Sequence, residues 1–99
     1  MTSVWFLPAA LVELRAACNW YESECPGLGD EFRDAVERAL DRITEFPLAS
    51  PVVHRAARRY LLARFPYCLF YRVVGDGIVV VALLHAARDP DVPESRLQG

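Results

Sequence analysis

The fold of this chain is decided by residues 64–90, which have the sequence RFPYCLFYRVVGDGIVVVALLHAARDP. Residues 67–74 are rich in β-branched and aromatic side chains, as strands are. The Gly-Asp-Gly sequence at 75–77 is typical of a tight turn. Residues 78–84 are apolar at every position, as in a central strand that is covered on both sides. The stretch therefore predicts a β-hairpin whose second strand is buried.

The chain ahead of this hairpin begins with a short strand and two helices. Residues 3–7 are an apolar run that Pro8 ends, which predicts a brief strand leading into a helix over 9–24. Pro26-Gly27 breaks the chain, and the apolar period of residues 29–46 predicts a second helix. The stripes expected to face the core are Leu11, Leu14, Cys18 and Tyr21 on the first helix, and Phe32, Ala35, Val36, Ala39, Leu40, Ile43 and Phe46 on the second.

A third strand is expected between the second helix and the hairpin. Pro47 ends the helix, residues 47–54 are expected to form a loop, and residues 58–63 alternate as a strand does. The predicted order is strand, helix, helix, strand, strand, strand. This is a small α+β fold in which a helical hairpin packs on an antiparallel sheet. We expect one domain over all 99 residues, with an ordered core over 3–90 and a loosely ordered tail over 91–99.

The composition excludes several classes of protein. With 54% hydrophobic and 24% charged residues, the chain is an ordered globular protein. No apolar run is long enough to span a bilayer and residues 1–10 do not resemble a signal peptide, so we expect a cytoplasmic protein with no membrane partner. Cys18, Cys25 and Cys68 have no metal-ligand spacing, so neither a disulfide framework nor a metal or other cofactor is expected. All eleven basic residues are arginine, which excludes Schiff-base and P-loop lysine chemistry.

The net charge of −2 hides an uneven distribution along the chain. Residues 1–45 carry nine acids and four arginines, a net charge of −5, and residues 76–99 carry four acids and two arginines, a net charge of −2. The middle third has no acid and five arginines, namely Arg55, Arg58, Arg59, Arg64 and Arg72. These arginines either attract an acidic protein segment or a nucleic-acid backbone, or pair with the acids of the first third on folding.

Four short motifs lie at defined places along these predicted elements. They are Pro8-Ala9-Ala10, Glu45-Phe46-Pro47, Arg64-Phe65-Pro66-Tyr67 followed by Phe70-Tyr71-Arg72, and His85 followed by Arg88-Asp89-Pro90. Over residues 3–90 the chain resembles the ParE/RelE superfamily of bacterial type II toxins, and it is closer to the ParE, or plasmid-stabilisation, branch. The resemblance implies a RelE/ParE-like fold, inhibition of growth and a cognate antitoxin.

The resemblance implies two activities of different classes, and the fold alone does not choose between them. ParE-like toxins bind DNA gyrase and stall it with DNA cleaved, whereas RelE-like toxins cleave messenger RNA on the ribosome. The candidate residues for cleavage are His85, Tyr67, Arg59, Arg64 and Arg88. Metal-free cleavage needs a base, an acid and stabilising cations, and no Tyr or His follows residue 89 to complete a pair. The gyrase-binding activity, which needs no catalytic residue, is therefore favoured. The third alternative is a relative that binds an antitoxin but poisons nothing.

His85, Arg88, Asp89 and the tyrosines also have structural explanations. Arg88 and Asp89 are expected to fix the exit of the last strand by hydrogen bonding, and a structural role is the stronger expectation for His85. Tyr67 and Tyr71 are expected to be packing residues whose hydroxyl groups are satisfied.

The candidate binding residues lie on the helices and strands. Phe70 and Arg72 fall on one face of their strand, so Phe70 is expected to be a partly exposed aromatic residue beside a charge. Trp20 lies off the main stripe of its helix and is a candidate interface residue, although core packing is the stronger expectation for both Trp20 and Trp5.

We expect a partner of complementary charge. The hypothesis is that an acidic C-terminal segment of the antitoxin lies across Arg58, Arg59 and Arg64. The assemblies considered are a homodimer and a heterotetramer with the antitoxin.

Overall fold

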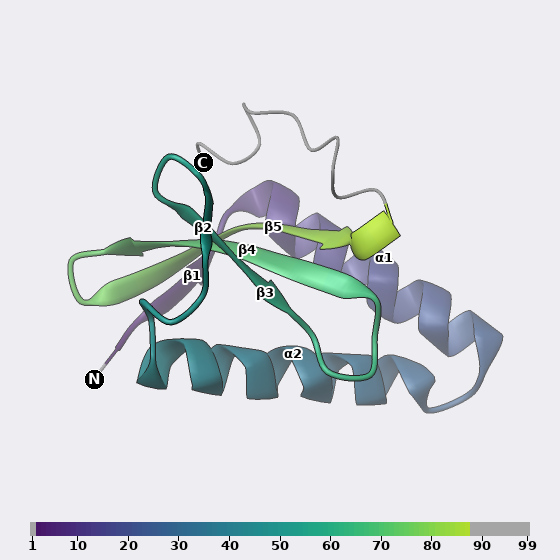
Figure 1. The fold of residues 1–99 in the computed structure, drawn as a ribbon. Coiled ribbons are helices and arrows are strands. Elements are labelled where there is room, and N and C mark those ends of the chain that lie inside the picture. Colours follow the sequence, from purple (N-terminus) through teal and green to yellow (C-terminus); the bar gives the residue numbers. More distant parts are fainter. Residues whose placement is uncertain (1, 88–99) are drawn as a thin grey trace.

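In the computed structural model, which describes residues 2–87, two helices pack against a five-stranded sheet (Figure 1). The described elements in chain order are β1 (Val4–Phe6), α1 (Pro8–Glu24), α2 (Leu28–Glu45), β2 (Val52–His54), β3 (Ala57–Leu61), β4 (Tyr67–Val74) and β5 (Gly77–His85). The predicted α+β fold, with a helical hairpin on a small sheet, is confirmed. Arg88, Asp89, Pro90 and the expected tail over 91–99 lie outside the described residues.

The sheet is mixed, with the strand order β1-β5-β4-β3-β2. The strands β2 to β5 are antiparallel neighbours, but β1 pairs with β5 in parallel, with Val4 opposite Ile78. The predicted antiparallel meander is present as β3, β4 and β5, and the short first strand β1 joins it as a parallel neighbour of β5. The reason is that β5 carries the chain back beside β1 in the same direction, after the helices and three other strands.

A short strand lies where a loop was expected. Residues 52–54 form β2, which pairs with β3 at the edge of the sheet, and the Arg59 N–H donates to the Pro51 carbonyl (3.1 Å). Val52 and Val53 are β-branched and favour this conformation, although half of the Val52 surface stays exposed (49%). The predicted third strand also shifts, to Ala57–Leu61. It ends early because the chain turns sharply at Arg64, where φ is 74°.

The main core lies between the helices and one face of the sheet. Leu69 and Tyr71 of β4 and Val80 of β5 have no exposed surface there, and Phe32 of α2 is equally buried. The helix stripes are confirmed with two exceptions. Leu11 is half-buried and lines the surface groove between α1 and α2. Phe46 is 49% exposed because it follows the end of α2 and lies under the guanidinium of Arg42, 5.2 Å from its ring centroid.

The opposite face of the sheet carries a second buried cluster, formed by Ala57, Cys68, Phe70, Val81 and Ala82. The strand β5 contributes to both clusters, with Val80 on the helix side and Val81 on the other, both at most 1% exposed. The prediction of a central strand covered on both sides is thus confirmed.

The two helices are joined by a capped, tight turn. The Glu22 carboxylate of α1 accepts hydrogen bonds from the N–H groups of Gly27 (2.9 and 3.1 Å) and Gly29 (3.0 Å), at the start of α2. The negative charge of the carboxylate is also stabilised there by the positive end of the α2 helix dipole. Gly29 lies so close to α1 that a Cβ there would be 2.7 Å from the Cys18 carbonyl oxygen. The helices therefore approach each other closely at this end.

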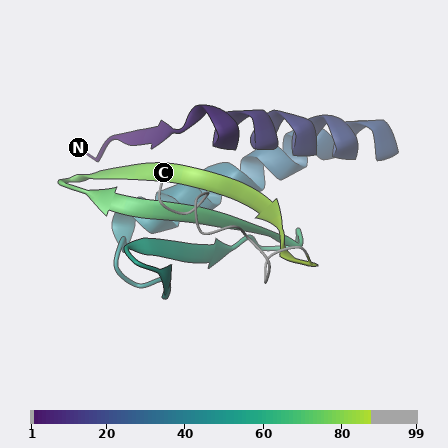
Figure 2. The same ribbon diagram turned by 90° about the horizontal axis from the view of Figure 1, so that it is seen from above.

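The helix α1 also protects the edge of the sheet. Seen from above, α1 runs beside β5, whereas α2 crosses beneath the sheet (Figure 2). Pairing with β1 ends where the Leu7 N–H donates to the Val80 carbonyl (2.9 Å). Farther along β5, the Leu83 N–H donates to the Glu13 carboxylate of α1 (3.1 Å). Glu13 therefore satisfies a backbone donor that no neighbouring strand reaches.

Candidate functional site

The larger of two surface hollows relevant to binding lies between α1 and the ends of β4 and β5. We call it the Trp20 groove, and its volume is about 690 Å³. Its lining residues are Glu13, Ala16, Ala17, Trp20, Tyr21, Pro66, Tyr67, Leu83, Leu84 and His85. Most of this lining is apolar or aromatic, which is typical of a surface that receives apolar side chains.

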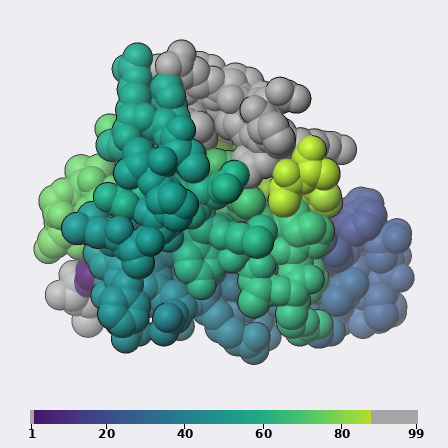
Figure 3. All heavy atoms as spheres, viewed as in Figure 1, coloured from purple at the N-terminus to yellow at the C-terminus, as the bar shows by residue number. Residues whose placement is uncertain are grey.

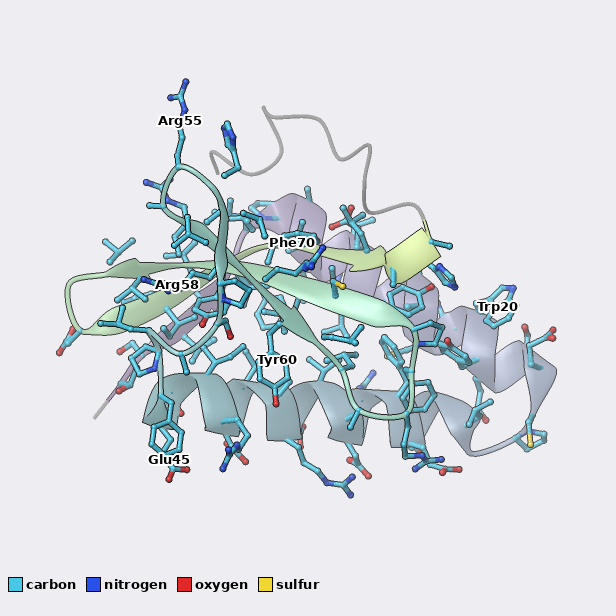
Figure 4. The ribbon with its side chains drawn as sticks, viewed as in Figure 1. Trp20, Glu45, Arg55, Arg58, Tyr60 and Phe70 are labelled. Atoms are coloured by element: carbon cyan, nitrogen blue, oxygen red, sulfur yellow. The ribbon has the colours of Figure 1, made fainter. Side chains whose placement is uncertain are left out.

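Trp20 is the large exposed apolar side chain of this groove. It is 56% exposed and points away from the sheet (Figure 4). Its ring meets that of Tyr21 edge-on at 5.0 Å, and it is Tyr21 that occupies the core position. The stronger expectation of a core tryptophan is therefore wrong for Trp20. It is also wrong for Trp5, which is 55% exposed and lies over Gly77 on the sheet.

Tyr67 and His85 meet in the Trp20 groove, as paired residues of β4 and β5. Their rings are edge-to-face with centroids 5.2 Å apart. The His85 Nδ1 accepts a hydrogen bond from the Ala87 N–H (3.0 Å), which fixes the chain as it leaves β5. One nitrogen of the His85 ring thus has a structural partner. Tyr21 also lines the groove, and its pKa is raised above its usual value by burial and, to a lesser extent, by the nearby Tyr67.

The remaining nuclease candidates lie elsewhere. Arg59 is opposite Phe70 in the β3–β4 pair, so it is on the face of the sheet that the helices do not cover. Arg64 lies in the turn after β3 and pairs with Glu31 of α2 (2.9 Å). Arg88 falls outside the described residues. Of the described candidates, the fold brings together only Tyr67 and His85.

The arginines proposed to hold an acidic tail do not form one surface either. The Arg58 Nη1 donates to the carbonyls of Ser50 (2.6 Å) and Leu48 (3.1 Å), and so holds the chain ahead of β2 against β3. Arg59 is on the other face of the sheet, since successive residues of a strand alternate. Arg64 belongs to the turn next to α2. A single segment lying across all three is therefore not supported.

Phe70 is not an exposed binding residue. It is 2% exposed and packs with Ala57, Cys68, Val81 and Ala82 in the second cluster. The expectation of a partly exposed Phe70 is wrong because this face of the sheet has a core of its own. Arg72, on the same face, is half-buried.

A second hollow, which the sequence did not predict, lies between α2 and β3. We call it the arginine groove, and its volume is about 410 Å³. Its lining residues are Ala35, Arg38, Ala39, Asp41, Arg42, Tyr60, Ala63 and Arg64. Tyr60 points from β3 towards α2 (Figure 4), and α2 lies directly below the β3–β4 region on the face seen in Figure 3. The only sequence signal was the spacing of Arg38 and Arg42, one helical turn apart.

Within residues 2–87 no group of three or more His, Cys, Asp or Glu side chains is arranged to hold a metal ion. None of the helices described is long and apolar enough to cross a membrane. Cys18 and Cys68 are buried, whereas Cys25 is exposed beside the turn between the helices.

The family model for the ParE toxin of the type II toxin–antitoxin system parDE matches residues 4–90. A structure described as the chromosomal ParDE TA system from P. aeruginosa is similar with a TM-score of 0.61 and 19% identity, over 86% of this chain and 96% of that one. The isolated E. coli RelE toxin is similar with a TM-score of 0.64 and 21% identity, over 87% of this chain and 85% of that one. No curated protein matches the sequence.

Proposed function

Because the chain belongs to the ParE toxin family of type II toxin–antitoxin systems, we propose that it acts in the cytoplasm by binding and inhibiting DNA gyrase, and that a cognate antitoxin neutralises it. The family implies an antitoxin partner, whereas gyrase as the target is our inference. Inhibition by binding requires an accessible surface and no reacting groups.

The observation that carries this proposal is the separation of the candidate nuclease residues. Tyr67 and His85 lie in the Trp20 groove, but Arg59 is on the other face of the sheet and Arg64 is paired with Glu31 beside α2. Cleavage of RNA requires cations at the phosphate that the base and acid act on. Among the described residues, neither arginine is placed beside the Tyr67–His85 pair. This arrangement supports a toxin that acts by binding.

The Trp20 groove provides such a toxin with an exposed apolar surface for binding a partner. Of the two aromatic residues expected to bind a partner, Trp20 is 56% exposed and lines an apolar groove, whereas Phe70 is buried. Exposed aromatic residues beside an apolar hollow often carry a large share of binding energy in protein interfaces. We therefore assign Trp20 and its groove to partner binding, whereas Phe70 has almost no accessible surface for that role.

Two assays on the purified toxin test the target. Supercoiling by gyrase should stop and cleaved DNA should accumulate, whereas messenger RNA in a parallel in vitro translation should stay intact. Cleavage that occurs only with translating ribosomes would contradict the proposal. If induction without antitoxin left growth unaffected, the chain would instead be a non-toxic relative.

The ribosome-dependent endonuclease is the second candidate, because the adjacent rings of Tyr67 and His85 form a pair, among the described candidates, that could exchange protons with RNA. The double variant Tyr67→Phe/His85→Gln separates the two activities. A gyrase inhibitor should retain its growth inhibition in this variant, and a nuclease that uses the pair should lose about 100-fold or more in cleavage rate. Thermal melting of the variant shows that any loss is not a failure to fold.

A further inference from the structure

The arginine groove brings three guanidinium groups to one hollow from two parts of the chain. Arg38 and Arg42 come from successive turns of α2, and Arg64 comes from the turn after β3. The floor between them is formed by small side chains, including Ala35, and the far wall is Tyr60. The groove therefore combines positive charge at its rim with an apolar floor.

Three arginines and one acid, Asp41, line this groove. Arg64 pairs with Glu31 (2.9 Å), but both side chains are about half exposed (58% and 49%), so water screens this pair. Arg42 lies over the ring of Phe46, and neither Arg42 nor Arg38 forms an ion pair with a described residue. Clustered cations that outnumber the acids of the same groove raise the local potential and attract an anionic group.

We propose that the arginine groove binds an acidic segment of a partner polypeptide, and that the antitoxin supplies this segment. The identity of the partner rests on the proposed function, whereas the acidic character of the ligand rests on the groove. Arg38 and Arg42 are one helical turn apart, about 6 Å along the axis. Carboxylates on successive turns of a helix, or on alternate residues of a strand about 6.6 Å apart, match this spacing. An intervening aliphatic side chain would contact the alanine floor.

The surroundings of the groove favour a short acidic peptide over a nucleic acid. Asp41 lines the groove itself, and α2 carries six acids against three arginines, a net charge of −3. A phosphodiester backbone carries a charge on every nucleotide and extends beyond the groove, so it would meet this acidic surface. A peptide can place two carboxylates at Arg38 and Arg42 and leave the rest of α2 untouched.

The acidic segment would thus lie beside α2 rather than across Arg58, Arg59 and Arg64. Arg58 is committed to the carbonyls of Leu48 and Ser50, and Arg59 is on the other face of the sheet. Only Arg64 is common to the two sets. The cations that face one another in the fold include two from the helix whose surface looked acidic from the sequence.

The test measures binding of a short fluorescein-labelled peptide of repeated Glu-Leu-Glu to the full chain by fluorescence anisotropy. The double variant Arg38→Glu/Arg42→Glu should weaken binding about tenfold or more, because two charge-assisted contacts become repulsive. The matched control is Arg15→Glu/Arg33→Glu, which makes the same charge change in the groove between α1 and α2. The control should change the affinity by less than about threefold, since its charges lie elsewhere.

Each other outcome overturns the inference. Equal weakening by both double variants would show only attraction by net charge. If Arg38→Glu/Arg42→Glu did not weaken binding, the groove would not be the binding site of the peptide. An unlabelled single-stranded DNA that displaces the peptide at lower concentration than unlabelled peptide would make the ligand a nucleic acid. If the charge-reversed variant does not fold by circular dichroism, Arg38→Ala/Arg42→Ala gives the same comparison.

The peptide assay involves no gyrase, so its failure and the failure of the proposed function are distinguishable. If the toxin leaves supercoiling intact but binds the peptide through Arg38 and Arg42, gyrase is not its target. The arginine groove is then still a binding site for an acidic peptide. In the same format, the cognate antitoxin should bind Arg38→Glu/Arg42→Glu more weakly than the control variant. Equal affinity for the two variants would show that the antitoxin does not use the groove.

Discussion

Replacing Gly29 with alanine should destabilise the protein, because α2 begins in close contact with α1. The added Cβ would be 2.7 Å from the Cys18 carbonyl oxygen, 2.9 Å from Glu22 Oε1 and 3.0 Å from Glu22 Cβ. The first of these atoms is backbone, and Oε1 already accepts the Gly29 N–H (3.0 Å). The two helices must therefore separate, or the cap at the start of α2 must be lost.

The size of the effect follows from two opposing contributions. Overpacking of this kind costs about 1–3 kcal/mol of unfolding free energy. Alanine is favoured over glycine inside a helix by up to about 1 kcal/mol, but Gly29 lies in the first turn of α2, where this gain is smaller. We expect a net loss of roughly 1–2 kcal/mol. For a domain of this size that lowers Tm by about 5–15 °C.

Thermal melts and urea titrations of Gly29→Ala give the loss directly. The control is the same substitution in a Glu22→Ala background, which removes the carboxylate but leaves the contact with the Cys18 carbonyl. Most of the cost of Gly29→Ala should persist there. If Gly29→Ala proves neutral or stabilising, helix propensity outweighs the contact and the close approach of the helices is refuted.

Two tyrosines give further predictions about stability. The buried Tyr71 hydroxyl donates to the Pro47 carbonyl (2.8 Å), so Tyr71→Phe should lower the unfolding free energy in urea by about 1–2 kcal/mol. A loss below about 0.3 kcal/mol would show that this bond adds nothing. Because burial raises the pKa of Tyr21, the folded state keeps this proton longer than the unfolded state does, and stability should fall as the pH rises above about 10. Urea midpoints of Tyr21→Phe should fall less steeply over that range, and an unchanged slope would assign the alkaline loss to other groups.

The hairpin was predictable because each of its signals is local. Pro66 precedes the strand, the glycines at 75 and 77 follow it, and β4 spans Tyr67–Val74 as predicted. The parallel pairing of β1 was not predictable in this way. It depends on where β5 returns after more than 70 residues, and no short-range pattern records that.

The positions of the tryptophans show the limit of periodicity. Trp20 and Tyr21 are adjacent on α1, about 100° apart around the helix axis, so either could lie at the margin of the buried stripe. Tyr21 takes the core position because Phe32 and Phe65 surround it, with ring centroids 5.1 and 5.0 Å away. Those partners come from distant parts of the chain. The arginine groove was missed for the same reason, since Arg64 joins Arg38 only in the folded protein.

Some acids of residues 1–45 form hydrogen bonds with the backbone, which their charge alone does not predict. Of the two explanations for the arginines at 55–72, pairing with these acids applies to Arg64 and Glu31. Glu13 instead accepts a backbone N–H of β5, and Glu22 caps α2. Neither of these two carboxylates lines the arginine groove, where Asp41 is the one acid among the lining residues.

The Trp20 groove and the arginine groove lie on either side of the same turn, between β3 and β4. Pro66 lines the first and Arg64 lines the second. The turn is held by the Leu62 N–H, which donates to the Tyr67 carbonyl (2.9 Å), and by Phe65, which is buried with its ring 5.1 Å from that of Phe32. The two grooves are therefore fixed relative to each other before any partner arrives. A polypeptide that engages both would lose little free energy to reorganisation of the toxin, which favours tight binding by one continuous segment.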